Sequence, residues 1–308
     1  MTKVAVLDDW QGVARSSADW SPLLARAEVV FIAQAFGDED DAARKLADFE
    51  IVLSMRERTP LPASLINRLP KLRMLGITGA RNATLDTTAC TARGTLVCNT
   101  TGGSGTQAAP AELALGLLLA AARAIPAGDA NMRAGRFQEG IPVGVSLAGK
   151  TIGIIGLGRL GSYMAHYCRA LNMIVLAWSE NLTSEQAQAA GATLVSKEEL
   201  LSSSDAVSIH LVLSPRSRGL IGAADIVRMK LGAILINTSR GPIVDEAALL
   251  EALQSRRIIA ALDVYDREPL PASHPLRKAP NTVLTPHLGY GKLGRNSTSR
   301  ASRIRSPF

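Results

Sequence analysis

The sequence predicts an α/β protein with two doubly wound domains, each built on a parallel sheet. Short continuous apolar runs alternate with segments of helical periodicity along the 308 residues, a pattern typical of parallel strands with helices on both faces of the sheet. The length exceeds what one small core needs, and the 47% apolar content is enough for two cores. Aromatic residues make up only 4%, which favours close helix-on-sheet packing over a stacking surface for nucleic-acid bases.

The first part of the chain contains four candidate strands, at residues 4–7, 29–32, 51–54 and 72–77. Apolar residues recur at helical spacing over residues 39–49, where we expect a helix. Residues 100–105 are rich in Gly, Ser and Thr, a composition typical of a joint between domains. We therefore predict a first domain of residues 1–98, completed by residues 288–308, and a second domain of residues 99–287. A nearly uniformly apolar segment, residues 111–125, predicts a buried helix at the start of the second domain.

Six further candidate strands follow, at residues 151–155, 174–177, 206–210, 233–237, 259–263 and 283–284. The first of them leads directly into Gly156-Leu157-Gly158-Arg159-Leu160-Gly161 and then into a helical segment. In this context Gly156 permits a tight turn, Gly158 lets the backbone approach a pyrophosphate, and Gly161 lets the helix pack closely on the strand. The helix N-terminus at Arg159 and Leu160 offers N–H groups to phosphate oxygens. The loop predicts a dinucleotide-binding domain of Rossmann type, although a strand–turn–helix without a ligand can use the same glycines.

The position expected to select between NAD and NADP carries no acid. An Asp or Glu about 20 residues beyond the glycine loop would bind the adenosine ribose, but here the second strand is followed by Ser179 and then Glu180. A serine tolerates a 2′-phosphate, whereas Glu180 would repel one, and no arginine stands nearby in the sequence. This pattern favours NAD and leaves NADP possible.

Three further polar segments lie at the ends of candidate strands, where parallel α/β sheets carry their chemistry. They are Asn237-Thr238-Ser239-Arg240-Gly241, Leu262-Asp263-Val264-Tyr265-Asp266-Arg267-Glu268-Pro269 and Leu284-Thr285-Pro286-His287-Leu288-Gly289. Together with the glycine loop, these ordered motifs resemble the D-isomer-specific 2-hydroxyacid dehydrogenase family over residues 3–290. The resemblance implies a Rossmann-type cofactor domain beside a flavodoxin-like substrate domain, NAD as cofactor and a homodimer. It also implies that the chain interconverts a small 2-oxo acid and its D-2-hydroxy acid.

The same resemblance implies three catalytic residues. We expect Arg240 to bind the substrate carboxylate, His287 to protonate the 2-oxo group during reduction, and Glu268 to hydrogen-bond and orient His287. Hydride addition builds negative charge on oxygen, so a proton donor and a fixed cation lower the barrier. Imidazole titrates near neutrality, and a guanidinium matches a planar carboxylate. Each residue alone would more often be an ordinary loop or surface residue, but their occurrence together after the glycine loop favours catalysis.

Other positions follow from the resemblance less directly. Along the cofactor we expect Thr238, Val212, Ser214 and Asp263, the last of these facing the nicotinamide amide. The substrate is expected to contact Arg56, in Met55-Arg56-Glu57-Arg58-Thr59, and Asn82, in Gly79-Ala80-Arg81-Asn82. Arg56 fits equally well as one member of an Arg–Glu pair on a surface loop.

Composition argues against several other classes of function. The net charge is +7, but residues 291–308 hold five basic residues and no acid, so the basicity belongs to a tail and argues against a nucleic-acid partner. The three cysteines have no CxxC spacing, which predicts no metal site and suits a reducing cytoplasm. The N-terminal segment has two acids by position 9, which is atypical of a signal peptide, and the longest apolar run is too short to cross a membrane.

The tail departs from the family pattern. Family members carry a long amphipathic helix after the position of Tyr290, whereas residues 291–308 have few apolar residues and none at helical spacing. A basic tail for an anionic partner and a frameshift near codon 291 both explain this, and the sequence leaves them open. The alternative to an oxidoreductase is a dinucleotide-sensing scaffold of the same fold without turnover, but the presence of Arg240, Glu268 and His287 argues against it.

Overall fold

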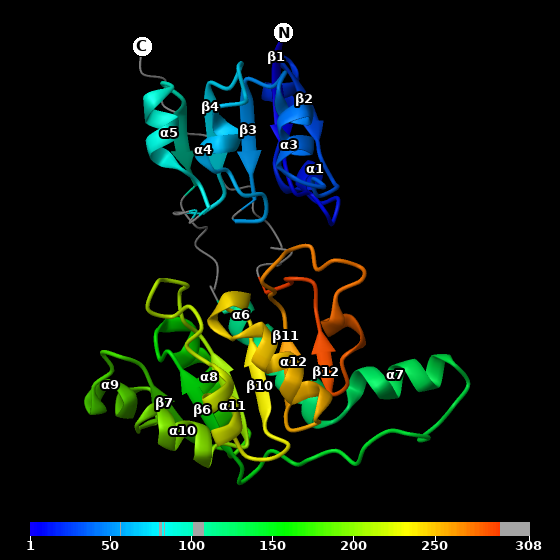
Figure 1. Cartoon of the computed structure of the whole chain (residues 1–308), viewed down its shortest axis with the longest axis vertical. Helices are drawn as coiled ribbons and strands as arrows, with labels where there is room; N and C mark the ends of the chain where they lie inside the picture. Colours follow the sequence, from blue (N-terminus) through cyan, green and yellow to red (C-terminus); the bar gives the residue numbers. More distant parts are fainter. Residues whose placement is uncertain (56, 80–81, 83, 101–107, 290–308) are drawn as a thin grey trace. The chain divides into compact units, whose positions relative to one another are not determined.

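The computed structural model describes residues 1–289, apart from 56, 80–81, 83 and 101–107 (Figure 1). The chain divides into two compact units, one formed by residues 1–100 and the other by residues 108–289 within that range. Each unit has one sheet, and every strand pair in the described residues is parallel. The predicted class, two doubly wound parallel α/β domains, is confirmed.

The first unit has a five-stranded sheet of order β2-β1-β3-β4-β5, which is the flavodoxin-like order. Its strands are β1 (Thr2–Val6), β2 (Ala27–Phe31), β3 (Ile51–Ser54), β4 (Met74–Ile77) and β5 (Leu96–Asn99). Its helices are α1 (Ala14–Ser17), α2 (Ser21–Leu24), α3 (Glu39–Leu46), α4 (Ala63–Ile66) and α5 (Thr87–Ala92). The helix predicted over residues 39–49 starts where expected, because the Asp38 carboxylate accepts from the Asp41 amide at 2.7 Å and caps it.

The two faces of this first sheet differ in burial. On one face, Val52 and Leu75 are fully buried in a cluster shared with α3, α4 and α5. On the other, Ile51 pairs with Met74 and Met74 with Leu96, so their side chains share a face. Ile51 and Met74 are only half-buried, and Leu96 is 59% exposed.

The second unit has a seven-stranded sheet of order β12-β11-β10-β9-β6-β7-β8. This contains the Rossmann order, with β6 at the centre where the direction of winding reverses. Its strands are β6 (Thr151–Ile155), β7 (Ile174–Trp178), β8 (Thr193–Leu194), β9 (Ala206–Ile209), β10 (Ile234–Asn237), β11 (Ile259–Leu262) and β12 (Thr282–Leu284). Its helices are α6 (Ala109–Ala122), α7 (Ile125–Arg133), α8 (Arg159–Ala170), α9 (Ser184–Ala189), α10 (Lys197–Ser203), α11 (Ala223–Arg228) and α12 (Glu246–Gln254), with 3-10 turns η1 (Gly241–Ile243) and η2 (Pro275–Lys278).

This second sheet is buried on both faces, as a parallel sheet requires. All four residues of β9 and of β10 are buried. Val207 and Ile209 pack into a cluster with α10, α11 and α12, whereas Ala206 packs into a second cluster with α6 and α8. The two-sided core explains why these strands read as continuous apolar runs rather than as alternating ones.

The helix predicted over residues 111–125 is shorter at its carboxyl end than expected. α6 ends at Ala122, Ala124 adopts a left-handed φ of +51°, and Pro126 lies in the first turn of a separate helix, α7. Figure 1 shows α7 and the segment after it extending away from the body of the second unit. Three apolar side chains on this arm are largely exposed, Met132, Phe137 and Val143.

The sequence predicts neither a membrane span nor a metal site, and the described residues bear on both predictions only in part. No single described helix is long and apolar enough to span a bilayer, and α6 and α7 reach that length and composition only as a pair bent by 67°. The described residues contain no group of three or more potential metal ligands. The predicted basic tail, residues 291–308, lies outside the described residues.

Candidate active site

The glycine loop joins β6 to α8, and its three glycines meet different surroundings. Gly156 has φ +95°, and a Cβ there would lie 2.7 Å from the His210 carbonyl oxygen. A Cβ on Gly161 would overlap the carbonyl oxygen of Gly156. A Cβ on Gly158, in contrast, would meet nothing within 4 Å. The first and third glycines are therefore required by the fold itself, whereas the second leaves exposed backbone that another molecule can approach.

The N-terminus of α8 opens onto this loop. Gly158 is the N-cap and supplies no side-chain cap, and the first turn holds no acid. The Ser162 amide makes a helical bond, to the Gly158 carbonyl at 2.9 Å, so the amides of Arg159, Leu160 and Gly161 come before the first i−4 acceptor of the helix. Exposed N–H groups at the positive end of a 12-residue helix form an anion-binding site. A dinucleotide pyrophosphate fits both this donor set and the open space at Gly158.

The other residues predicted to line the cofactor follow neighbouring strands at the same edge of the sheet. Ser179 follows β7 and is half-buried, and Thr238 follows β10 and is half-buried. Val212 and Ser214 lie in the loop after β9, where Val212 is 85% exposed. Ser217 ties this loop together, since its hydroxyl donates to the Val212 carbonyl and accepts from the Ser214 amide, both at 2.8 Å. An exposed aliphatic side chain on a loop held by its own hydrogen bonds suits contact with a flat ligand.

Arg240 lies on a loop whose backbone is held by a buried amide. Asn237 is 1% exposed; its Nδ2 donates to the Arg240 carbonyl at 2.9 Å and its Oδ1 accepts from the Ser239 amide at 3.0 Å. The Ser239 hydroxyl donates to the Ile209 carbonyl on β9 at 2.8 Å. Gly241 has no room for a Cβ, which would overlap the peptide between Tyr265 and Asp266. The base of the Arg240 side chain is therefore fixed relative to β9 and β10.

The structure brings His287 and Glu268 together, although 19 residues separate them in the chain. His287 Nδ1 lies 2.5 Å from Glu268 Oε2, and both side chains are mostly buried. The second carboxylate oxygen, Oε1, accepts from the Tyr265 amide at 3.0 Å. A carboxylate only accepts hydrogen bonds, so we assign the proton of this bond to Nδ1 of His287. Proton exchange with a substrate would then use Nε2.

The carboxylate of Asp263 binds the loop that carries His287. Asp263 is fully buried; its Oδ1 accepts from the Leu288 amide at 2.7 Å and from the Thr285 hydroxyl at 2.6 Å, and its Oδ2 accepts from the Gly289 amide at 2.9 Å. Its backbone carbonyl accepts from the His287 amide at 2.9 Å. Burial raises the pKa of the Asp263 carboxyl, and the hydrogen bonds that it accepts oppose this rise. The contact of Asp263 with the nicotinamide amide stays a prediction. Its hydrogen bonds to the His287 loop are a second role, which the sequence did not indicate.

The two predicted substrate residues belong to the first unit. Arg56 lies outside the described residues. Asn82 is described, and its Oδ1 accepts from the Thr84 amide at 2.9 Å and from the Thr84 hydroxyl at 2.8 Å. The amide oxygen of Asn82 thus stabilises its own turn.

Residues 115–289 match the profile of "D-isomer specific 2-hydroxyacid dehydrogenase, NAD binding domain". The chain belongs to this family. A D-3-phosphoglycerate dehydrogenase of Archaeoglobus fulgidus is 39% identical over 250 residues, which is 81% of this chain and 47% of that protein. One from Bacillus subtilis is 36% identical over the same shares. A crystal structure of a phosphoglycerate oxidoreductase from Vibrio cholerae has a TM-score of 0.88 and 34% identity, covering 95% of this chain and 93% of that one.

The family match decides the cofactor. Residues 115–289 form the NAD binding domain of the family, and NAD is the cofactor of this chain. The chain spans about half the length of the curated relatives that it matches.

Proposed function

We propose that this chain is an NAD-dependent oxidoreductase that interconverts a small 2-oxo acid and its D-2-hydroxy acid. The observation that carries the proposal is the hydrogen-bonded pair of His287 and Glu268, 2.5 Å apart, in the same unit as the dinucleotide loop. An imidazole that is held by a carboxylate at Nδ1 can donate and accept a proton at Nε2. The names of the curated relatives, D-3-phosphoglycerate dehydrogenases, support a substrate of this class.

The residues divide the reaction between them. NADH, when bound, supplies the hydride that reduces the 2-carbon. His287 donates its Nε2 proton to the carbonyl oxygen as that oxygen gains charge, and it takes the proton back in the reverse direction. Glu268 accepts from Nδ1 throughout, so it keeps the ring oriented and stabilises the imidazolium. Arg240 binds the substrate carboxylate and offers a fixed cation near the developing charge.

The remaining site residues take supporting roles. Around the coenzyme we assign the pyrophosphate to the backbone of Gly156, Gly158, Arg159, Leu160 and Gly161. The rest of the coenzyme would contact Ser179, Val212, Ser214, Thr238 and Asp263. Arg56 and Asn82 would contact the substrate. Glu180, exposed directly after Ser179, would repel a 2′-phosphate, so the proposal favours NAD over NADP.

Assembly and location are part of the same proposal. The arm formed by α7 and the segment after it exposes Phe137 by 66% and Val143 by 96%. Burying such side chains releases about 1.5–3 kcal/mol each, so a second copy of the chain is the partner that we propose for the arm. Cys90, Cys98 and Cys168 are all free thiols, which supports a reducing compartment, the cytoplasm.

The test compares the wild-type protein with His287→Ala in NADH and NADPH oxidation, using glyoxylate and hydroxypyruvate. We expect the rate to fall at least ~100-fold in the variant, because general acid catalysis by a positioned side chain contributes about that much. NADH titration of both proteins is the control, and the two affinities should agree. A folded wild-type protein that binds NADH but turns over no 2-oxo acid would instead favour the dinucleotide-sensing scaffold.

A further inference from the structure

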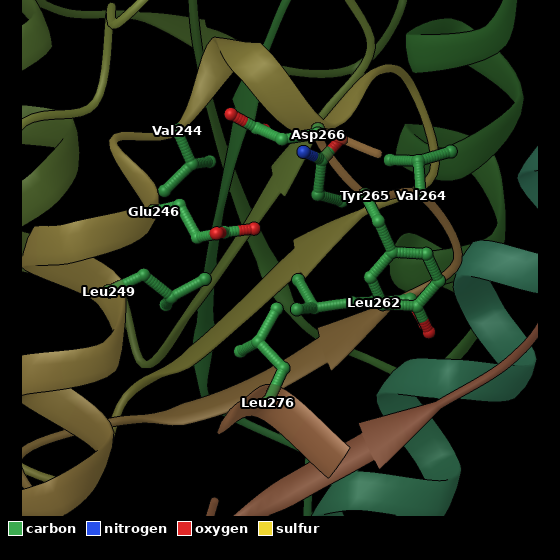
Figure 2. Close-up of a pocket in the computed structure, with 10 residues that line it drawn as sticks. Val244, Glu246, Leu249, Leu262, Val264, Tyr265, Asp266 and Leu276 are labelled. Atoms are coloured by element: carbon green, nitrogen blue, oxygen red, sulfur yellow. The ribbon is translucent and has the colours of Figure 1, made fainter. Parts of the chain in front are cut away.

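Tyr265 lies in the loop after β11, three residues before Glu268. Its ring is 9% exposed and packs in the hydrophobic cluster that includes Leu249, Leu262 and Leu276. The cavity beside it is about 10 Å³, room for about one water molecule. Figure 2 shows the Tyr265 hydroxyl directed away from the carboxylate of Glu246. The packing therefore fixes where the ring and its hydroxyl lie.

Two groups of Tyr265 reach the two halves of the pair. Its backbone N–H donates to Glu268 Oε1 at 3.0 Å, and its hydroxyl donates to the Thr285 carbonyl at 2.9 Å. The same Thr285 carbonyl accepts from the His287 amide at 3.1 Å. The hydroxyl thus holds the carbonyl of Thr285, two residues before His287. His287 itself has φ +53° in this turn.

We propose that Tyr265 is a positioning residue that sets the distance between His287 and Glu268. The two side chains come from loops after different strands, β12 and β11, and Tyr265 is bonded to both loops. This inference rests on the proposed function, since it concerns the efficiency of the same proton transfer. The hydroxyl proton is committed to the Thr285 carbonyl, and burial raises the pKa of Tyr265 above its ordinary value, so we assign the hydroxyl a positioning role.

Tyr265→Phe isolates the hydroxyl. The variant keeps the ring packing and the backbone bond to Glu268, and the Thr285 carbonyl keeps the His287 amide as a donor. We expect kcat/KM for the 2-oxo acid to fall about 2- to 10-fold, the range that one net hydrogen bond gives. NADH affinity should stay unchanged. In proton NMR, the downfield signal of the His287 Nδ1–H in its bond to Glu268 should shift or broaden.

Two control variants separate positioning from a loss of stability. Tyr167→Phe makes the same chemical change on α8, where the hydroxyl has no hydrogen bond to any described residue. Leu249→Val loosens the cluster around Tyr265 and leaves its hydroxyl bond intact. Both controls should keep the wild-type kcat/KM and the wild-type imidazole signal, even where the melting temperature of Leu249→Val falls as far as that of Tyr265→Phe.

Three results would overturn the inference or the function on which it rests. Wild-type kcat/KM and an unmoved imidazole signal in Tyr265→Phe overturn the positioning role. An equal loss of rate in Leu249→Val at a matched melting temperature reduces Tyr265 to a packing residue and also overturns it. A wild-type protein without turnover sinks the proposed function, and the imidazole signal then still decides whether Tyr265 sets the geometry of the pair.

Discussion

Gly158→Ala separates the ligand-binding use of the glycine loop from its structural use. Gly158 has φ −78° and ψ −161°, a conformation that any residue adopts, and its added methyl would meet nothing within 4 Å. The fold should therefore lose no more than about 1 kcal/mol, because alanine is a poorer N-cap than glycine but also reduces the freedom of the unfolded chain. In the proposed function, however, the coenzyme phosphates approach the backbone at Gly158, and the methyl would stand in their way.

The expected loss of affinity follows from the contacts that the methyl displaces. Losing one charge-assisted hydrogen bond from backbone N–H to phosphate removes about 1.5–3 kcal/mol. Since about 1.4 kcal/mol changes an equilibrium constant tenfold, the dissociation constant of NADH should rise about 10- to 100-fold. Fluorescence titration with NADH measures the affinity, and a circular dichroism melt measures the stability.

Gly161→Ala is the matched contrast. Its Cβ would overlap the Gly156 carbonyl oxygen and lie 3.1 Å from Ile154 Cγ2, so the loop or the helix must shift. Overpacking of this kind costs about 1–3 kcal/mol, and the melting temperature should fall together with NADH affinity. The assignment of the loop would be refuted if Gly158→Ala bound NADH as tightly as the wild-type protein, or if it melted as early as Gly161→Ala.

Three further predictions concern the second unit. Burial lowers the pKa of His210 to about 4, so the stability that neutral His210 contributes is complete above pH 6.5. This stability is lost as the pH falls towards 4, by up to about 3 kcal/mol. In urea unfolding across this range, the free energy of unfolding should depend less steeply on pH in His210→Gln than in the wild-type protein, and an equal slope would contradict the argument. Asp263→Asn puts an NH₂ group against the amide donors of the His287 loop, so kcat/KM should fall at least ~10-fold, and an unchanged rate would mean that these bonds are dispensable. Ser179→Asp should raise the ratio of NADH to NADPH activity about tenfold through repulsion of the 2′-phosphate, and a ratio that stays constant would place the ribose elsewhere.

Local pattern was sufficient for most of the strands. The strand predicted at residues 51–54 is β3 and that at residues 151–155 is β6, residue for residue, because compact apolar runs ended at clear turn residues. The pattern predicts no strand at β5, because Leu96–Asn99 is an edge strand with Leu96 exposed and a polar residue at its end. β8 has only two residues, too few for any periodicity to register.

The break between α6 and α7 is marked in the sequence by Pro126. By propensity, residues 120–125 all continue a helix, so the predicted helix ran on to residue 125. Ala124 is left-handed and Pro126 occupies the first turn of α7, the position that proline favours at a helix start. Pro126 is therefore the residue in the sequence that marks the start of α7 and the end of α6 before it.

The contacts inside the site were harder to predict than its members. Motifs predicted His287 and Glu268 as site residues, yet the roles of Asp263 and Tyr265 depend on hydrogen bonds between the loops that follow β11 and β12. Such bonds join residues up to 26 positions apart, as Asp263 and Gly289 are. These loops meet because of the register in which β10, β11 and β12 pair. A single apolar run does not predict how a strand will be paired with its neighbours.

The half-exposed face of the first sheet affects how the protein is handled at the bench. Ile51, Met74 and Leu96 stay partly wetted in the folded chain, so they offer environment-sensitive dyes and phenyl resins a place to bind without any melting. Fluorescence of such a dye would report folded molecules along with denatured ones. Melts of this protein are therefore better followed by circular dichroism or tryptophan emission, and a phenyl column should retain it in its native state.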